Sequence, residues 1–128
     1  MIRIFEVLGK IRSKERPRIN RYTMNIYTPT GTKSYEYQIA QAYRTMFSSK
    51  MNGDIKVEII AHFKISKANT KKIKPLTNCT KKPDIDNIVK VVLDGLNKVA
   101  YEDDKQVIEV KALKVWDVVD YLQIKLTN

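Results

Sequence analysis

The pattern that most constrains this fold is a change of apolar period between the middle and the last third of the chain. From Ile55 to Lys64, apolar and polar residues alternate, which is the period of a β-strand with one buried face. Between Asp84 and Val99, apolar residues instead recur at spacings of three and four, which is the period of an amphipathic helix. A chain that carries both periods predicts helices packed on a sheet.

The segments on either side complete the expected order of elements. Pro83 disfavours helix before it and Asp84 is a good N-cap type, so the second helix is expected to start there. Two closing segments joined through Trp116-Asp117 are predicted to form a C-terminal β-hairpin. The prediction is an α+β fold, a small single domain over residues 1–128 with a mixed β-sheet and two main helices. The expected ranges are strands at Met1–Leu8, Met24–Tyr27, Ile55–Lys64, Gln106–Val115 and Val118–Leu126, and helices at Ser34–Phe47 and Asp84–Val99.

Charge and composition narrow the classes of partner. The formal net charge of +10, from 24 Lys and Arg against 14 Asp and Glu, indicates nucleic acid or another anionic surface. One cysteine and one histidine exclude a Cys/His zinc site within a single chain, so a bound metal is expected to have oxygen ligands. No apolar run approaches the roughly 18 residues of a membrane span, so we expect no membrane partner and a cytoplasmic location. Glycines are too few for a phosphate-binding loop, and we expect no nucleotide cofactor.

Lysines accumulate in a stretch without acidic residues that runs from Ile59 to Pro83. This stretch is predicted to be a long basic loop that leads directly to Asp84, and a second cationic segment runs from Gly9 to Tyr22. A lysine run alone is equally consistent with a solvated surface loop, but its position before Asp84 favours phosphate binding. The predicted DNA-binding residues are Lys71, Lys72, Lys74, Lys81, Lys82, Arg16 and Arg18.

Carboxylates concentrate at the start of the second predicted helix. Asp84 and Asp86 belong to the same helix end, where like charges repel unless a cation or a donor lies between them. Hard oxygen ligands of this kind hold Mg²⁺ against a phosphate backbone, which indicates a metal-dependent nuclease. Structural roles remain open for each residue alone: Asp84 as an N-cap, and Asp86 with Lys90 as an ordinary ion pair one turn apart.

A second acidic group, Glu102-Asp103-Asp104, follows this helix. A helix from Asp84 to Val99 carries the chain about 24 Å, so the second group starts at its far end. The sequence alone does not determine whether the two acidic groups meet.

The residues around both groups carry a resemblance to a known family. They are Lys82-Pro83-Asp84-Ile85-Asp86-Asn87-Ile88-Val89-Lys90, Leu93-Asp94-Gly95-Leu96-Asn97 and Tyr101-Glu102-Asp103-Asp104-Lys105-Gln106-Val107. Together with Arg16-Pro17-Arg18 and Tyr27-Thr28-Pro29 upstream, they closely resemble the phage and Gram-positive branch of the RusA family of crossover junction endodeoxyribonucleases.

The resemblance implies a small homodimeric enzyme that resolves four-way (Holliday) DNA junctions by Mg²⁺-dependent hydrolysis, with Mn²⁺ able to substitute. Paired symmetric nicks of this kind serve DNA recombination and repair, in a bacterium or from a phage or prophage gene. The family's catalytic and metal-binding carboxylates correspond to Asp84, Asp86 and Asp104, with Asp103 as the alternative to Asp104. Lys90 occupies the position of a helix lysine that also matters in the family.

Symmetry gives a separate reason to expect a homodimer. A four-way junction has approximate two-fold symmetry, and paired nicks require two sites, which a two-fold dimer of one-site chains supplies. Apolar positions from Val107 to Leu113, or the N-terminal segment, are the expected interface material.

Two other functions compete with junction resolution. One is a basic nucleic-acid-binding protein without enzymatic activity, in which the acids act as caps and ion-pair partners. The other is a family member that cuts branched DNA other than four-way junctions. Incubation of labelled four-way junction and linear duplex with Mg²⁺ or EDTA separates these possibilities.

Overall fold

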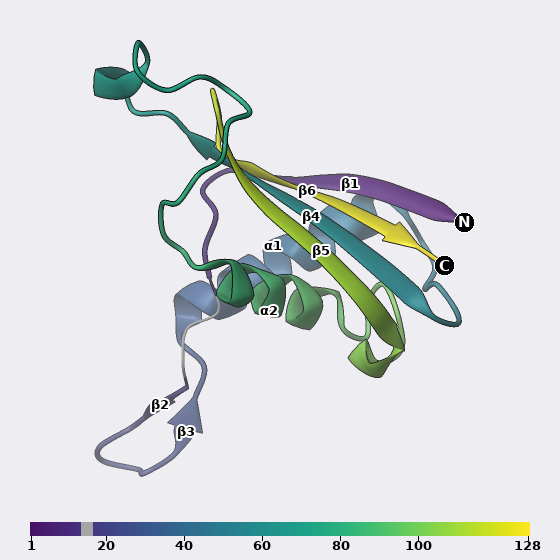
Figure 1. Ribbon diagram of the computed structural model, residues 1–128. Coiled ribbons are helices and arrows are strands. Elements are labelled where there is room, and N and C mark those ends of the chain that lie inside the picture. Colours follow the sequence, from purple (N-terminus) through teal and green to yellow (C-terminus); the bar gives the residue numbers. More distant parts are fainter. Residues whose placement is uncertain (14–16) are drawn as a thin grey trace.

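Two helices pack on one face of a four-stranded sheet in the computed structural model, which describes residues 1–13 and 17–128 (Figure 1). The strand order is β1-β6-β4-β5, and β2 and β3 form a separate two-stranded arm that projects from the body. The predicted α+β class, mixed sheet and two main helices are confirmed. Arg16, predicted to bind DNA, lies outside the described residues. The elements are β1 (Ile2–Leu8), β2 (Arg18–Ile19), β3 (Ile26–Tyr27), α1 (Thr30–Met46), β4 (Ile55–Lys64), η1 (Lys67–Asn69), α2 (Ile85–Leu96), η2 (Asp104–Gln106), β5 (Val107–Asp117) and β6 (Tyr121–Thr127).

Strand β4 is the centre of the sheet and has the bounds that its alternation predicts. It pairs antiparallel with β6 along one edge and parallel with β5 along the other. Its inward-facing side chains are buried against the helices, because every second residue of a strand points to the same face. These residues are Ile55, Val57, Ile59, Ala61 and Phe63.

The predicted C-terminal β-hairpin is wrong. β5 and β6 follow each other in the chain, but β4 lies between them and pairs with both. Their connecting turn crosses the end of β4, where the Ile65 N–H donates to the Asp117 carbonyl (2.9 Å) and the Lys64 N–H donates to the Asp120 carboxylate (2.8 Å). Apolar alternation specifies which face a strand buries and not which strand lies beside it, so the sequence pattern was compatible with either pairing.

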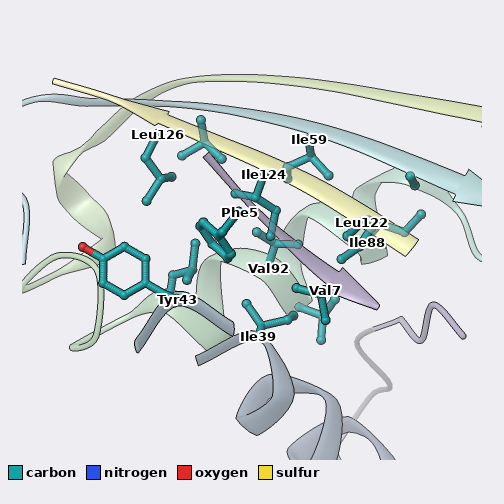
Figure 2. Close-up of a cluster of buried hydrophobic side chains, with 14 of the residues drawn as sticks. Phe5, Val7, Ile39, Tyr43, Ile59, Ile88, Val92, Leu122, Ile124 and Leu126 are labelled. Atoms are coloured by element: carbon teal, nitrogen blue, oxygen red, sulfur yellow. The ribbon is translucent and has the colours of Figure 1, made fainter. Parts of the chain in front are cut away.

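The core lies between the sheet and the two helices (Figure 2). The four strands and both helices contribute branched aliphatic side chains, and α1 adds the ring of Tyr43, whose edge meets the ring of Phe5 at a centroid distance of 5.6 Å. Burial of this cluster is the main favourable contribution to folding. The labelled members are Phe5, Val7, Ile39, Tyr43, Ile59, Ile88, Val92, Leu122, Ile124 and Leu126.

The helix boundaries differ modestly from the expected ones. α1 begins at Thr30 rather than Ser34, because the N–H groups of Thr32 and Lys33 already donate to the Pro29 carbonyl. α2 begins directly after Asp84, as predicted, and ends at Leu96 rather than Val99. Among the described residues, no helix combines the length and apolarity needed to cross a membrane.

Gly95 allows the two helices to approach closely. A Cβ atom at this position would lie 3.0 Å from the backbone oxygen of Glu36 and 3.1 Å from the Cβ of Ile39, both on α1. Such contacts are tighter than most Cβ atoms make, so α1 would have to shift by a few tenths of an ångström, and a packed helix backbone does not shift at low cost. The glycine therefore sets the distance between α1 and α2.

We expect Gly95→Leu to lower the free energy of unfolding by about 2–3 kcal/mol, because the added atoms overpack the helix contact. Urea denaturation monitored by circular dichroism measures this change. Gly31→Ala is the matched control, since its Cβ would meet only the Arg12 side chain at 3.5 Å and helix propensity favours alanine by about 1 kcal/mol. A Gly95→Leu protein as stable as the wild type would contradict the close approach.

Candidate functional site

The N-terminal end of α2 presents two carboxylates to solvent. Asp84 is the N-cap residue by position, and its carbonyl accepts from the N–H groups of Asn87 and Ile88 (both 3.2 Å). Its carboxylate, however, makes no capping hydrogen bond within the described part of the chain. Asp86 is exposed in the first turn. The Asp84 carboxylate at this helix end is therefore not used to cap the helix backbone, and the Asp86 carboxylate faces solvent.

Lys90 lies one turn beyond Asp86 on the exposed side of α2. In the described residues these two side chains form no ion pair, so the ordinary structural role considered for them is not observed. The opposite side of the helix carries the buried residues. Because that side packs on the core, the side with Asp86 and Lys90 faces solvent. Asp86 and Lys90 thus stand close in space with both charges available.

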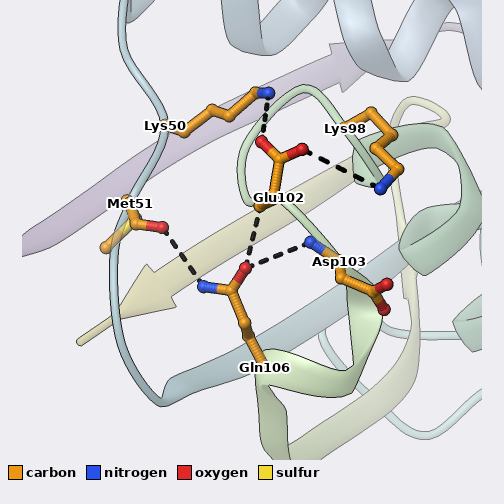
Figure 3. Close-up of polar contacts among 6 residues, drawn as sticks. All are labelled: Lys50, Met51, Lys98, Glu102, Asp103 and Gln106. Carbon is orange, nitrogen blue, oxygen red and sulfur yellow. Dashed lines mark hydrogen bonds and ion pairs between the residues drawn. The ribbon is translucent and has the colours of Figure 1, made fainter.

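The second acidic group is held by a capping box at η2 (Figure 3). The Asp103 carboxylate accepts from the Lys105 N–H (3.0 Å), and Gln106 Oε1 accepts from the N–H groups of Glu102 (2.9 Å) and Asp103 (3.1 Å). Gln106 Nε2 in turn donates to the Gly53 carbonyl (3.1 Å). Sequence reasoning missed Gln106, although the Asp-x-x-Gln spacing from Asp103 is a recognisable capping-box signal.

The three acids of this group have different surroundings. Glu102 pairs with Lys50 (2.7 Å), and this hydrogen bond and charge lower the pKa of its carboxyl. The Lys105 N–H lowers the pKa of Asp103, whose carboxylate is partly committed to the cap. Asp104 is exposed at the first position of η2. A side-chain hydrogen bond with Asp104 also lowers the pKa of Asp103, so the two carboxylates lie together and Asp104 is the more exposed of the pair.

Tyr101 locates Asp104 relative to α2. The Tyr101 ring is buried and its hydroxyl donates to the Leu93 carbonyl (2.8 Å). Burial raises the pKa of this phenol, and the nearby charges of Asp104 and Asp94 raise it further. Asp104 thus lies beside the last turns of α2, near Asp94 and not at the helix start.

The two acidic groups do not meet within one chain. Asp94 follows Asp86 by eight residues, which is about 12 Å along the helix axis. Across residues 1–13 and 17–128, no three Asp, Glu, His or Cys side chains converge as a metal site. The structure therefore joins Asp84 with Asp86 and Asp103 with Asp104, and separates the pairs by most of the length of α2.

A cavity of about 490 Å³ adjoins Asp84, and we call it the basic pocket. Two of its cations, Lys81 and Lys82, were predicted DNA-binding residues, and two others, Lys10 and Arg12, were not. Nothing in the sequence shows that the segment after β1 returns to the start of α2, so only the three-dimensional structure reveals this pairing. The residues that line the pocket include Lys10, Ile11, Arg12, Ser13, Gly31, Thr32, Phe63, Lys81, Lys82, Pro83, Asp84, Asn87 and Asp120.

The predicted basic loop is partly fixed to the sheet. Its second half lies along β5, where the Leu76 N–H donates to the Trp116 carbonyl (2.7 Å) and the Cys79 N–H donates to the Lys114 carbonyl (3.1 Å). The first half, with η1, projects beyond the sheet (Figure 1). It carries the exposed Lys71, Lys72 and Lys74, whereas Lys81 and Lys82 lie at the pocket.

The arm formed by β2 and β3 carries Arg18, the remaining predicted DNA-binding residue that the structure describes. The chain runs from β3 almost directly into α1, whose first turn forms part of the basic pocket. Tyr22 at the turn of the arm is 97% exposed. The arm and the basic loop therefore both attach next to the pocket that contains Asp84.

Comparisons with known proteins gave two matches that cover most of the chain. The model of a family described as endodeoxyribonuclease RusA matches residues 9–127. The chain is also similar to the uncharacterized protein YqaN of Bacillus subtilis (strain 168), with 33% identity over 122 residues, covering 88% of this chain and 86% of YqaN.

We expect Gln106→Leu to lower the free energy of unfolding by about 1–2 kcal/mol, because the N–H groups of Glu102 and Asp103 lose their acceptor. Urea denaturation measures the loss, and amide hydrogen exchange by NMR shows whether it is local to these two residues. Gln123→Leu makes the same chemical change on β6 and should leave both amides as slow as in the wild type. Unchanged exchange at Glu102 and Asp103 in Gln106→Leu would contradict the role of the capping box.

Proposed function

Because the chain belongs to the RusA family of endodeoxyribonucleases, we propose that it resolves four-way DNA junctions by Mg²⁺-dependent, paired and symmetric nicks. The family consists of crossover junction nucleases, so the chain is an endonuclease of DNA recombination. The observation that carries the finer proposal is the start of α2, where exposed carboxylates adjoin a cationic pocket. We place its action in the recombination and repair of cytoplasmic DNA, in a bacterium or from a phage-borne gene.

The donor set at the start of α2 fits a hard divalent cation. The Asp84 carboxylate makes no cap bond and Asp86 is exposed, so both offer the oxygen ligands that Mg²⁺ prefers, and Mn²⁺ accepts the same ligands. A bound Mg²⁺ supplies a Lewis acid that activates a water and offsets charge on the phosphate in the transition state. Lys90 presents an ammonium group beside these carboxylates, where it stabilises a phosphate oxygen by charge.

The competing proposal of a basic binding protein without activity requires the acids to serve as caps and ion-pair partners. In the described residues Asp84 makes no side-chain cap and Asp86 makes no ion pair with Lys90. Those roles therefore do not explain why exposed acids stand at this end of α2. Cutting of other branched DNA remains the second candidate, because the same site would act on any branch that reaches the basic pocket.

The exposed edge of β5 supports a homodimer. The basic loop covers β5 only from Lys114 onward, and within the described residues no strand pairs with the outer edge from Val107 to Leu113. Ile108 is 58% exposed and Leu113 is 48% exposed on this stretch. An unpaired edge with apolar side chains is a template for antiparallel pairing with a second copy.

Charge favours one register for this pairing. Antiparallel self-pairing centred on Val110 places Glu109 of one chain opposite Lys111 of the other, and opposite charges across a strand pair are favourable. The same register brings Val107 of one copy opposite Leu113 of the other. We therefore propose the stretch Val107–Leu113 as the interface.

This register also offers a way to complete the metal site. Leu113 and Asp84 line one shallow cavity, so the start of a second β5 would lie near Asp84. Asp104 precedes that strand by three residues. In the proposed dimer, Asp84 and Asp86 of one copy and Asp104 of the other therefore form one site, although they stay apart within a chain.

We expect Asp84→Asn, Asp86→Asn and Asp104→Asn each to lower the rate of junction cleavage by about a thousandfold, since each removes a charged ligand worth about 4 kcal/mol in the transition state. Junction binding should be unchanged or tighter, because negative charge that faces phosphate is lost. Labelled four-way junction and linear duplex, each with Mg²⁺ or EDTA, provide the assay, with gel shifts for binding. Asp94→Asn on the same helix is the matched control. Near-wild-type cutting by Asp86→Asn would refute the catalytic assignment, and binding without metal-dependent cutting by the wild type would refute the proposed function.

We expect complementation when Asp84→Asn and Asp104→Asn chains carrying different tags are co-expressed. About half of the dimers are then mixed, and each mixed dimer has one intact site if the site is shared between copies. Single nicks should return at about a quarter of the wild-type rate, whereas each variant alone stays inactive. No recovery in purified mixed dimers would show that Asp104 acts with the carboxylates of its own chain.

A further inference from the structure

We propose that the basic pocket receives an unpaired nucleotide of the branched DNA, next to the phosphate that is cut. This inference rests on the proposed function and adds to it a specific substrate subsite. Asp84, a proposed metal ligand, forms part of the pocket wall, so a nucleotide held there is adjacent to the reacting phosphate. Lys10 and Arg12 are the new binding residues that it assigns.

The pocket has the size and the chemistry of a nucleotide site. Its volume of about 490 Å³ falls within the range of about 300–1,000 Å³ that is typical of small-molecule pockets. Contact with the backbone of a stacked duplex requires only surface cations, and it leaves a hollow of this volume unexplained. The hollow therefore indicates a group that leaves the double helix.

The walls of the pocket differ in character. Ile11 and Phe63 are core side chains that leave a small apolar floor in the pocket, and Lys81 and Lys82 next to Asp84 suit a phosphate. Ser13 and Asn87 add hydrogen-bonding groups. An amphipathic ligand with one anionic end matches this distribution.

Asp120 orients the ligand within the pocket. Its carboxylate accepts from the Lys64 N–H (2.8 Å) and its carbonyl accepts from the Gly9 N–H (3.1 Å), so this wall is fixed to β4 and to the end of β1. The negative charge of the Asp120 carboxylate repels a phosphate. Its oxygens can accept a hydrogen bond from a base amino or imino group. The phosphate is therefore expected at the Lys81–Lys82 wall and the base at the Asp120 wall.

Such a pocket would select branch points. A base inside a duplex must be unstacked and unpaired before it can enter a pocket, and this costs least where pairing is already interrupted. At a four-way junction every base stays paired, but the exchanging strands change stacking partners at the branch point, so the pairs there open at lower cost than pairs inside a duplex. The pocket therefore gives the enzyme a means of preferring branched DNA that surface lysines alone do not provide.

Gly31 offers a substitution that fills the pocket and leaves its charge intact. It lies in the first turn of α1, and a Cβ there would meet only the Arg12 Nη1 at 3.5 Å, an ordinary contact. Gly31→Leu therefore extends into open space beside Arg12, and leucine favours helix over glycine. Gly31→Ala, with one methyl group, is the matched control.

The direct test uses a single-stranded trinucleotide with a central 2-aminopurine, titrated against the protein and followed by fluorescence. We expect Gly31→Leu to weaken binding by about tenfold or more, the scale of a lost base contact, and Gly31→Ala to stay within about twofold. Lys10→Ala with Arg12→Ala should also weaken binding, whereas Arg44→Ala on the far end of α1 should not. Wild-type trinucleotide affinity in Gly31→Leu, with its thermal stability retained, would overturn the proposal.

A second arm uses four-way junction and linear duplex with 2-aminopurine beside the cleaved phosphate. We expect wild-type protein to raise the fluorescence in the junction and not in the duplex, and Gly31→Leu to abolish the rise while duplex affinity stays within about twofold. An equal rise with Gly31→Leu would overturn the pocket as the site. If the wild type cuts no branched DNA but Gly31→Leu still blocks the trinucleotide, the proposed function fails and the nucleotide site stands.

Discussion

The position of β4 is the constraint on which the rest of this structure depends. A central strand must pair along both edges, and its parallel neighbour β5 can be reached only by a crossover that returns the chain to the same end of the sheet. That crossover contains the basic loop and α2, so Lys81, Lys82 and Asp84 lie on the segment that topology forces across the sheet. The site is thus a product of the crossover and not of a separate insertion.

Sequence patterns predicted the positions of helices and strands better than they predicted which strands pair in the sheet. Alternation located the bounds of Ile55–Lys64, because each residue of a strand with one buried face is apolar or polar according to the side to which it points. Alternation carries no information on which strands pair, and the predicted C-terminal hairpin was wrong for this reason. Asp84 was placed at the helix start from local chemistry alone. Lys10 and Arg12 escaped prediction because the pocket that they line together with Lys82 joins segments about seventy residues apart in the chain.

The start of α2 illustrates a trade between stability and activity. An aspartate at an N-cap ordinarily accepts a backbone hydrogen bond worth about 1 kcal/mol, and Asp84 does not make this bond among the described residues. The capping box of Asp103 and Gln106 shows the contrasting case, in which one acid secures the loop and its neighbour Asp104 is left exposed. An acid that stabilises a loop through backbone hydrogen bonds and an acid that is exposed to solvent are therefore neighbours in the sequence.

The bare edge of β5 has a consequence for how such an enzyme is controlled in a cell. If the carboxylates of a site come from two chains, a newly made single chain carries only halves of sites and is harmless to the chromosome. The amount of competent nuclease then rises with the square of the protein concentration when that concentration is low. Dosage alone would keep cutting negligible until expression is high, without any inhibitor.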